Sequence, residues 1–168
     1  MEKNQKMFSV VNNFLDNEIL HKIKTICVSE FFPWYVVKEK PYQLSHIIVK
    51  NHEGKIEVTS DFFFPIVEPI IKQLKIEKVF LSQLHMLPKT KDHELLVHKF
   101  PINENDKEQK LILFINSSNG YLKRLEQKYE AVENRAFFMK KREPFQIYTS
   151  VNDLPMFFIE IDYLPQDS

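Results

Sequence analysis

Histidine and carboxylate side chains are the residues of this chain that could hold a metal ion or move a proton. None of the histidines follows position 98, and the six are His21, His46, His52, His85, His93 and His98. His93, Glu94 and His98 form one candidate set of metal ligands, since imidazole and carboxylate suit several divalent metals. In a strand the two histidines of this set would point to opposite faces, whereas a loop could bring them together. A pair of solvated loop histidines is the competing interpretation.

The remaining reactive groups point to no other chemistry. One cysteine, Cys27, excludes an internal disulfide and a thiolate zinc cluster, and it is interpreted as a small apolar helix residue. Glu160 and Asp162 alternate along the last apolar stretch, and we interpret them as the polar face of a strand rather than a catalytic dyad. The sequence shows no glycine-rich phosphate loop, serine nucleophile elbow or Cys–His pairing.

Basic side chains are the candidates for contact with a partner. Lys and Arg together number 23, as do Asp and Glu, and this balance argues against a general polyanion binder. Two basic groups could contact nucleic acid: Lys123, Arg124 and Lys128, and Lys140-Lys141-Arg142. They are weak evidence for such binding, because no aromatic stacking platform accompanies them. The polar segments 89–110 and 122–131 are expected to face a partner. The candidate contacts are Lys89, Lys91, His93, Lys107, Lys123, Arg124 and Lys128.

Hydrophobic spacing predicts helices before most of the strands. Asp16 is the expected N-cap of a helix with one apolar face, formed by Ile19, Leu20, Ile23, Ile26 and Cys27. A second helical stretch is expected from Ser60 or Asp61 to Leu74, with Pro69 kinking or restarting it. Strands are expected at 8–14, 42–49, 55–58, 78–87, 111–115, 132–139, 146–150 and 156–163.

These elements predict one domain, residues 1–168, with helices on one side of a rolled antiparallel sheet, an α+β fold that is mostly β. Asn119-Gly120 is expected to form a turn because both residues tolerate positive φ. No apolar run reaches the roughly 18 residues that span a bilayer, and Met1–Met7 is too polar for a secretory signal.

The stretch from Leu111 to Met139 resembles a known protein family. It contains Asn-Ser-Ser-Asn-Gly-Tyr at 116–121 and Val-Glu-Asn-Arg-Ala-Phe-Phe at 132–138. These are similar to the Asn-Thr-Asn-Asn-Gly-Tyr-like turn and Val-Ala-Asn-Arg-like strand start of the small phage-type 2-oxoglutarate/Fe(II) oxygenases, which are prolyl-4-hydroxylase-like. The likeness runs from Phe14 to Leu164 and includes Phe31-Phe32-Pro33-Trp34-Tyr35. It implies a double-stranded β-helix core, also called jelly-roll or cupin-like, with the N-terminal helices packed on the sheet.

The same resemblance implies where an iron site would lie. Such enzymes use a His-x-Asp pair, a distal histidine and a basic residue that binds the 2-oxoglutarate carboxylate. Counting from Asn116 and Arg135 places these ligands at Pro101, Asn103 and Phe145, and the basic residue near 154–156. None of these positions carries the required group. No metal, catalytic residue or cofactor is therefore expected, with the set of His93, Glu94 and His98 as the alternative.

The function expected from this pattern is a catalytically inactive, oxygenase-like protein. It would be phage-encoded and would bind a virion protein or a host protein, in the virion or in the host cytoplasm. Membrane association is not expected, and neither nucleic acid nor a small-molecule ligand is expected as its partner. The alternative is an active Fe(II)/2-oxoglutarate-dependent oxygenase with unorthodox ligands.

Overall fold

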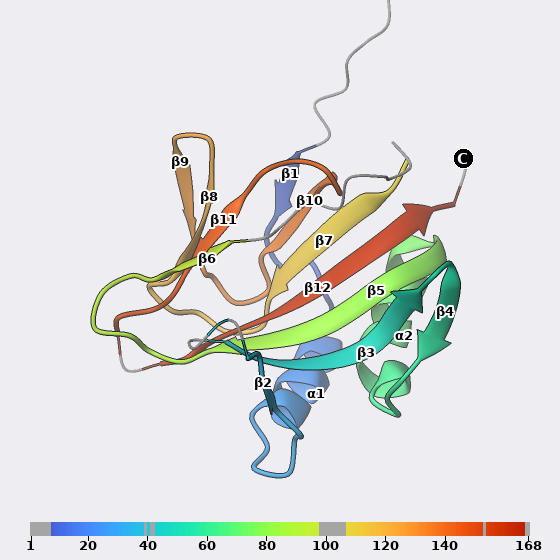
Figure 1. The fold of residues 1–168 in the computed structure, drawn as a ribbon, viewed down its shortest axis with the longest axis horizontal. Coiled ribbons are helices and arrows are strands. Elements are labelled where there is room, and N and C mark those ends of the chain that lie inside the picture. The colour runs from blue at the N-terminus through green and yellow to red at the C-terminus, as the bar shows by residue number, and fades with distance from the viewer. Residues whose placement is uncertain (1–7, 39, 41–42, 98–106, 153, 167–168) are drawn as a thin grey trace, which may run out of the picture.

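Two antiparallel sheets stacked on each other form the frame of the protein (Figure 1). The computed structural model describes residues 8–38, 40, 43–97, 107–152 and 154–166. The large sheet has eight strands in the order β1-β10-β7-β12-β5-β3-β2, with β4 paired to β3. These strands are β1 (Ser9–Val11), β2 (Tyr35–Val36), β3 (Leu44–His52), β4 (Lys55–Val58), β5 (Ile76–Leu87), β7 (Gln109–Phe114), β10 (Ala136–Lys140) and β12 (Met156–Pro165).

The small sheet covers one face of the large sheet. Its four strands follow the order β6-β11-β8-β9 and are β6 (Leu95–Val97), β8 (Tyr121–Arg124), β9 (Gln127–Glu130) and β11 (Gln146–Tyr148). The chain passes between the two sheets several times, as a double-stranded β-helix requires. The predicted fold, α+β and mostly β with this rolled core, is confirmed.

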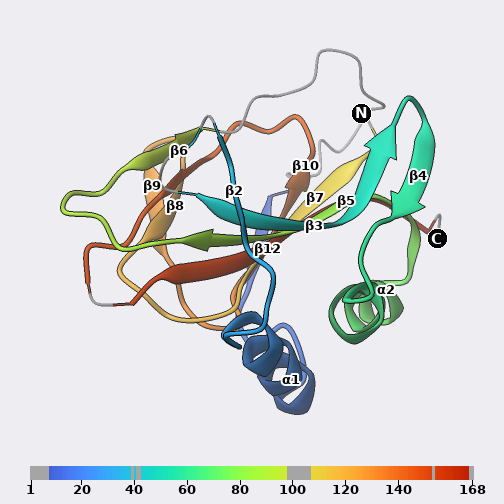
Figure 2. The same ribbon diagram turned by 60° about the horizontal axis from the view of Figure 1, so that its bottom comes forward.

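The helices cover the opposite face of the large sheet, as Figure 2 shows. Helix α1 (Asn17–Cys27) begins at Asp16, whose carboxylate accepts a hydrogen bond from the Glu18 amide at 2.8 Å, so the predicted N-cap is confirmed. The second stretch is a π-helix, η1 (Phe63–Val67), followed by α2 (Glu68–Leu74). Pro69 lies in the first turn of α2, where its missing N–H costs least, and the predicted restart is therefore confirmed. Among the described residues, no helix has the length and apolar character needed to cross a membrane.

Each face of the large sheet buries its own apolar cluster because side chains alternate along a strand. The helix-side cluster includes Ile23, Ile70, Leu113, Ile159 and Ile161. The inner cluster lies between the sheets and consists of Leu87, Ile112, Phe114, Leu122, Ala131, Phe137, Met139, Phe145, Ile147, Met156 and Phe158. Strand β12 serves both clusters along its length, which makes it the centre of the fold.

The family-like turn after β7 is held by asparagine side chains. The Asn116 amide donates to Pro155 O at 2.8 Å, and its oxygen accepts from Phe157 N at 2.9 Å. Asn119 Oδ1 accepts from Ser150 Oγ and from the amides of Val151 and Asn152 at 2.9 to 3.1 Å. These residues fix the loop before β12, so the sequence signature marks a structural feature and not a reactive group.

Gly120 has a different role from the predicted one. Neither Asn119 nor Gly120 adopts a positive φ, so the predicted conformation of this turn is wrong. A Cβ at Gly120 would lie 2.8 Å from Met156 Sδ and 2.9 Å from Tyr148 O. Close packing against β11 and β12 therefore requires glycine here. Positive φ occurs at Asn134 instead, at 63°, where the side chain hydrogen-bonds both Leu15 N and Leu15 O at 2.8 Å.

Three predicted segments need correction. Residues 122–131 were expected to be a polar segment without a strand, but they include most of the β8–β9 hairpin of the small sheet, since cross-strand pairing dominates over local polarity. The strand predicted at 132–139 starts at Ala136, because residues 132–135 form the Asn134 turn. The polar segment 89–110 contains β6 and the first residues of β7.

Candidate site between the two sheets

The inner face of the large sheet divides into an apolar half and a charged half. Along β12, Met156 and Phe158 belong to the inner cluster, and Glu160 and Asp162 follow on the same face. Along β7 the corresponding residues are Phe114 and Ile112, followed by Lys110. The charged half is buried all the same, with Lys110 5%, Glu160 3% and Asp162 4% exposed. Glu160 and Asp162 were predicted to form a polar strand face; that face is buried, because β12 is a central strand.

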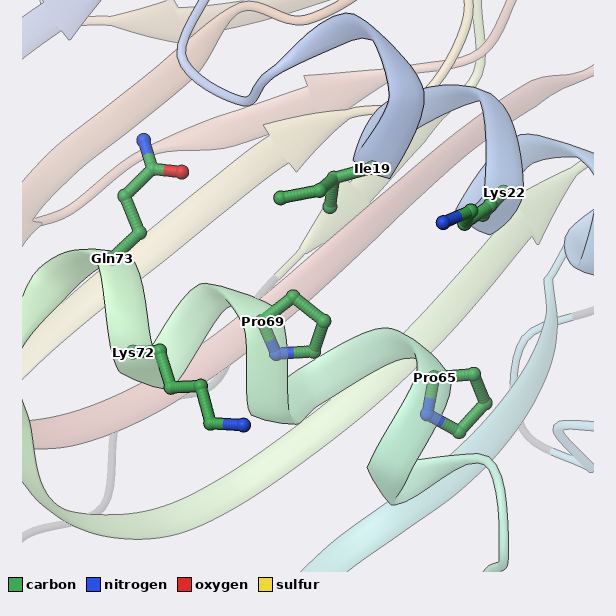
Figure 3. A pocket seen from close by; sticks show the side chains of 6 residues that line it. All are labelled: Ile19, Lys22, Pro65, Pro69, Lys72 and Gln73. Carbon is green, nitrogen blue, oxygen red and sulfur yellow. The ribbon is translucent and has the colours of Figure 1, made fainter.

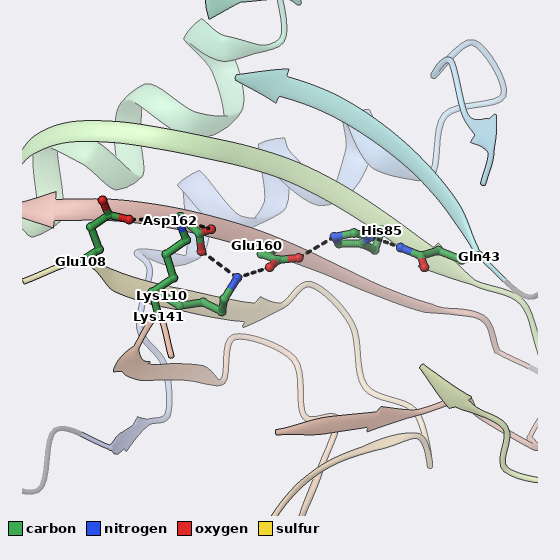
Figure 4. A network of polar contacts seen from close by, with 7 residues as sticks. All are labelled: Gln43, His85, Glu108, Lys110, Lys141, Glu160 and Asp162. Atoms are coloured by element: carbon green, nitrogen blue, oxygen red, sulfur yellow. Dashed lines mark hydrogen bonds and ion pairs between the residues drawn. The ribbon is translucent and has the colours of Figure 1, made fainter. Parts of the chain in front are cut away.

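A chain of polar contacts joins the segment before β3 to the three neighbouring strands β5, β12 and β7 (Figure 4). Gln43 Nε2 donates to His85 Nδ1 at 2.6 Å, so His85 carries its proton on Nε2 and donates it to Glu160 Oε2 at 3.0 Å. The Lys110 ammonium contacts Glu160 Oε1 and lies 2.7 Å from Asp162 Oδ1. The ring of His85 also stacks on Phe158 at 4.5 Å, which joins the charged half to the inner cluster.

The chain ends in a second cation at the border of the sheet. Lys141 Nζ lies 2.9 Å from Glu108 Oε2 and 3.7 Å from Asp162 Oδ2. Both Lys141 and Glu108 are mostly buried, with side chains 14% and 13% exposed. Each buried carboxylate of this network therefore has a cation beside it, as burial of charge requires.

The pKa values of the network follow from these contacts. Burial alone would lower the pKa of Lys110, but the carboxylates of Glu160 and Asp162 outweigh it, so the pKa is raised. Burial raises the pKa of Asp162; Lys110 opposes this shift and Glu160 adds to it. The ammonium of Lys110 thus occupies the position between two carboxylates that a bound cation would otherwise take.

Two buried groups outside this network make the protein sensitive to alkali. Burial raises the pKa of Cys27 from 9.0 to about 12, and that of Tyr163 from 10.0 to about 12. We expect the free energy of unfolding to fall between pH 9 and 12, because both groups ionise in the unfolded chain while they stay protonated in the folded one. The thiol alone contributes a loss of about 1.4 kcal/mol per pH unit in this window. Urea titrations over a pH series measure it.

The matched variant for this prediction is Cys27→Ala. It loses the thiol contribution, so its stability should decline less steeply above pH 9 than that of the wild type. Any stability lost at neutral pH through the smaller side chain shifts the curve without changing this slope. Equal slopes for the two proteins would contradict the assignment.

The structure places His93, one of the predicted alternative ligands, apart from this interior. His93 is exposed; its Nδ1 lies 2.6 Å from Thr149 O and its ring meets that of Tyr121 at 5.2 Å. Tyr121 and Leu122 are adjacent on β8, so their side chains point to opposite faces of the small sheet, and Leu122 belongs to the inner cluster. Tyr121 and the His93 ring in contact with it therefore lie at the outer face. The Glu94 amide donates to Thr149 Oγ1 at 2.8 Å. His98 directly follows β6 in the sequence and lies outside the described residues.

The predicted degenerate positions fall partly within the structure. Pro101 and Asn103 lie outside the described residues. Phe145 directly precedes β11 and belongs to the inner cluster. Met156, within the region expected to hold a basic residue, is fully buried in the same cluster. Their correspondence to ligand positions stays a prediction.

The predicted partner contacts lie mainly around the small sheet. Lys123 and Lys128 are register partners on β8 and β9, and Lys128 Nζ lies over the Tyr121 ring at 4.7 Å. Arg124 pairs with Glu143 at 2.6 Å and covers Phe8. Lys89, Lys91 and Lys107 flank β6 and β7 in the sequence. Their contact with a partner stays a prediction.

An open hollow of about 550 Å³ separates the two helices (Figure 3). Ile19, Pro65 and Pro69 give it an apolar lining, and Lys22, Lys72 and Gln73 complete it. Lys72 pairs with Glu68 at 3.2 Å, and both belong to one helix. The lining residues of this hollow belong to α1, η1 and α2, and none of them is a member of the charged network.

Sequence reasoning missed three members of the network. His85 carried no role in the prediction, Gln43 was not considered, and Lys110 was placed at the end of a partner-facing segment. That placement of Lys110 is wrong, because it is buried on β7. The available signal was the alternation of Lys110, Ile112 and Phe114, which puts the lysine on the same face as two core residues.

Comparison with solved structures identifies the fold as that of the 2-oxoglutarate/Fe(II) oxygenases. A prolyl hydroxylase from Trichoplax adhaerens, in complex with a hypoxia-inducible factor peptide, matches with a TM-score of 0.66 at 11% identity, over 96% of this chain and 85% of the other. A Pseudomonas putida prolyl-4-hydroxylase matches with a TM-score of 0.64 at 12% identity, over 97% of this chain and 95% of the other. A 2OG-Fe(II) oxygenase family oxidoreductase from Burkholderia pseudomallei matches with a TM-score of 0.66 at 7% identity, over 98% of this chain and 87% of the other. Neither the family models nor the curated proteins searched give a match.

These structures correct the predicted function. We expected a catalytically inactive binding or structural module and no enzyme, but the structural neighbours are hydroxylases and oxygenases that share the fold over nearly the whole chain. The prediction rested on the absence of any histidine after His98 and on ligand positions counted along the sequence from Asn116 and Arg135. Metal ligands converge in space, however, and a count along the sequence does not measure how close side chains lie in the fold.

The described residues alone do not fit the iron site of this fold. They contain no group of three or more His, Cys, Asp and Glu side chains that could hold a metal ion. His85 and Glu160 lie close together, but Glu160 already contacts the Lys110 ammonium. A three-ligand site built from this chain must therefore include a residue from outside the described ranges.

Proposed function

We propose that this chain is an Fe(II)- and 2-oxoglutarate-dependent oxygenase that holds its metal with an unusual set of ligands. The observation that carries the proposal is the complete two-sheet fold, shared over 96 to 98% of the chain with the oxygenase structures named above. Metal-assisted oxidation is the chemistry that a bound iron would supply in such a fold.

The end of β6 is the place where we expect the metal ligands. Val97 pairs with Gln146, the first residue of β11, so β6 brings the chain to the rim of the inner cluster beside Phe145. His98 is the next residue in the sequence, and the segment that follows also contains Glu104 and Asp106. This segment supplies imidazole and carboxylate donors, the types that such iron sites use. His93 is a poorer candidate because it lies at the outer face of the small sheet.

Metal content tests the proposed ligands. The protein is purified without chelator, loaded with Fe(II) under anaerobic conditions, and its bound iron is measured. We expect about one iron per chain in the wild type and in His93→Ala, and at least a tenfold weaker affinity in His98→Ala, as loss of a direct ligand should cause. His52→Ala, in the hairpin of β3 and β4, is the matched control. Equal iron binding by His98→Ala and the wild type would exclude His98 as a ligand.

A further inference from the structure

Lys110, Glu160 and Asp162 bring an amine and two carboxyl groups into contact inside the protein (Figure 4). Lys110 and Asp162 lie directly opposite each other on the neighbouring antiparallel strands β7 and β12. On its other side, Lys110 is in register with Met139 of β10, which is fully buried in the inner cluster. None of the three polar side chains is more than 5% exposed. The amine and its neighbours are therefore largely shielded from water.

The two carboxyl groups contact the lysine in different ways. Lys110 Nζ donates a hydrogen bond to Glu160 Oε1. It also lies 2.7 Å from Asp162 Oδ1, yet no hydrogen bond with favourable angles reaches this oxygen from the described residues. A buried acceptor without such a bond is uncommon and costs free energy. One carboxyl group is thus placed to exchange a proton with the nitrogen, and the other is placed beside the nitrogen itself.

We propose that Lys110 and Asp162 join in an intramolecular isopeptide bond, with Glu160 as the group that moves the protons. One ammonium proton of Lys110 first passes to Asp162, because burial favours the neutral acid. The free amine then attacks Cγ of Asp162, and Glu160 takes a proton from the nitrogen and gives it to the hydroxyl group that leaves as water. One C–N bond forms and one C–O bond breaks. The products are an amide and one water molecule, and no other reactant is consumed.

The position of the two groups favours this reaction. Reactants that a fold holds in contact behave as if present at about 10⁵–10⁸ M, and the shielded interior does not supply the water that would reverse the reaction. The two carboxylates raise the pKa of Lys110, however, so the free amine is a minor state and the bond forms slowly. The freshly folded protein is therefore the ion-paired form, and the bond accumulates afterwards. It would link β7 to β12, the two strands at the middle of the large sheet.

Mass spectrometry of the denatured full chain tests the bond. The wild type should become lighter by one water molecule, in a fraction that rises to most of the protein over several days at neutral pH. After digestion with trypsin, a branched peptide should join Lys110 to Asp162, and the chain should stay uncut after Lys110. An unchanged mass after this time would overturn the proposal. So would a loss of water that maps to any other residues.

Two variants test the assigned roles, and circular dichroism verifies that each one folds. Glu160→Gln keeps the shape of the side chain but cannot take up a proton, so it should slow formation of the bond about a hundredfold. Lys141→Arg is the matched control, because Lys141 is a second cation beside Asp162, 3.7 Å from its Oδ2. It should leave the rate unchanged. Loss of the bond in Lys141→Arg, or formation at the wild-type rate in Glu160→Gln, would contradict these roles. All of these outcomes are independent of iron binding and of the proposed oxygenase activity.

Discussion

Replacement of Lys110 by methionine should destabilise the protein by about 3–5 kcal/mol. The substitution keeps an unbranched side chain of similar length but removes the ammonium that Glu160 and Asp162 share. Both carboxylates are at least 96% shielded from solvent, and both would lose their nearest cation, while Asp162 keeps Lys141 at 3.7 Å and Glu160 keeps the His85 hydrogen bond at 3.0 Å. Chemical denaturation at pH 7 measures the loss.

The pH dependence separates this explanation from simple loss of packing. Lys110 holds the pKa of Asp162 down, so its removal raises that pKa further. A raised carboxyl pKa means that the folded state takes up a proton on acidification, and Lys110→Met should therefore regain stability relative to the wild type as the pH falls from 7 to about 4. The triple variant Lys110→Met, Glu160→Gln, Asp162→Asn removes all three charges and should recover at least half of the loss at pH 7. A loss that is unchanged by pH and by the triple substitution would contradict the electrostatic account.

Gly120→Ala should cost about 3 kcal/mol, because it overpacks the junction between the sheets. The new Cβ would lie 2.9 Å from Tyr148 O and 3.2 Å from Ser150 N, which are backbone atoms of β11 and the following loop. These atoms cannot move without disturbing the strand that delivers Phe145 to the inner cluster. Thermal and urea unfolding measure the effect.

The second glycine of the chain provides the control. Gly54 has a φ of +84° and no atom within 4 Å of its Cβ position, so Gly54→Ala introduces backbone strain without a clash. It should cost about 1 kcal/mol. Adding Met156→Ala to Gly120→Ala removes the side-chain contact at 2.8 Å but leaves the backbone contacts, and so it should not restore stability. Equal costs at the two glycines would contradict the packing argument.

The fold was predictable because local patterns and tertiary structure agree for its main elements. The apolar run that begins at Leu111 becomes a central strand, Asp16 caps α1, and Pro69 restarts the second helix. The small sheet was harder to predict. Its strands have three or four residues, and the β8–β9 hairpin is rich in lysine and glutamate, so neither length nor alternation marks it.

The charged network shows why the interior was difficult to read from the sequence. Lys110, Glu160 and Asp162 are residue types that are almost never fully buried unless they are paired. Their pairing depends on β7 and β12 being neighbours in register, with Asp162 opposite Lys110. The spacing along the chain gives no sign of this pairing, because 50 residues separate Lys110 from Glu160. Sequence reasoning therefore assigned Lys110 to a partner-facing segment, and Glu160 and Asp162 to the polar face of a strand.

Turnover of 2-oxoglutarate tests the proposed enzyme most directly. Purified protein loaded with Fe(II) is incubated with 2-oxoglutarate in air, and the succinate formed per chain is measured by NMR. The proposal predicts many equivalents of succinate from the wild type and from His93→Ala, and none above the metal-free background from His98→Ala. Succinate formation that stays at background in the iron-loaded wild type would contradict it.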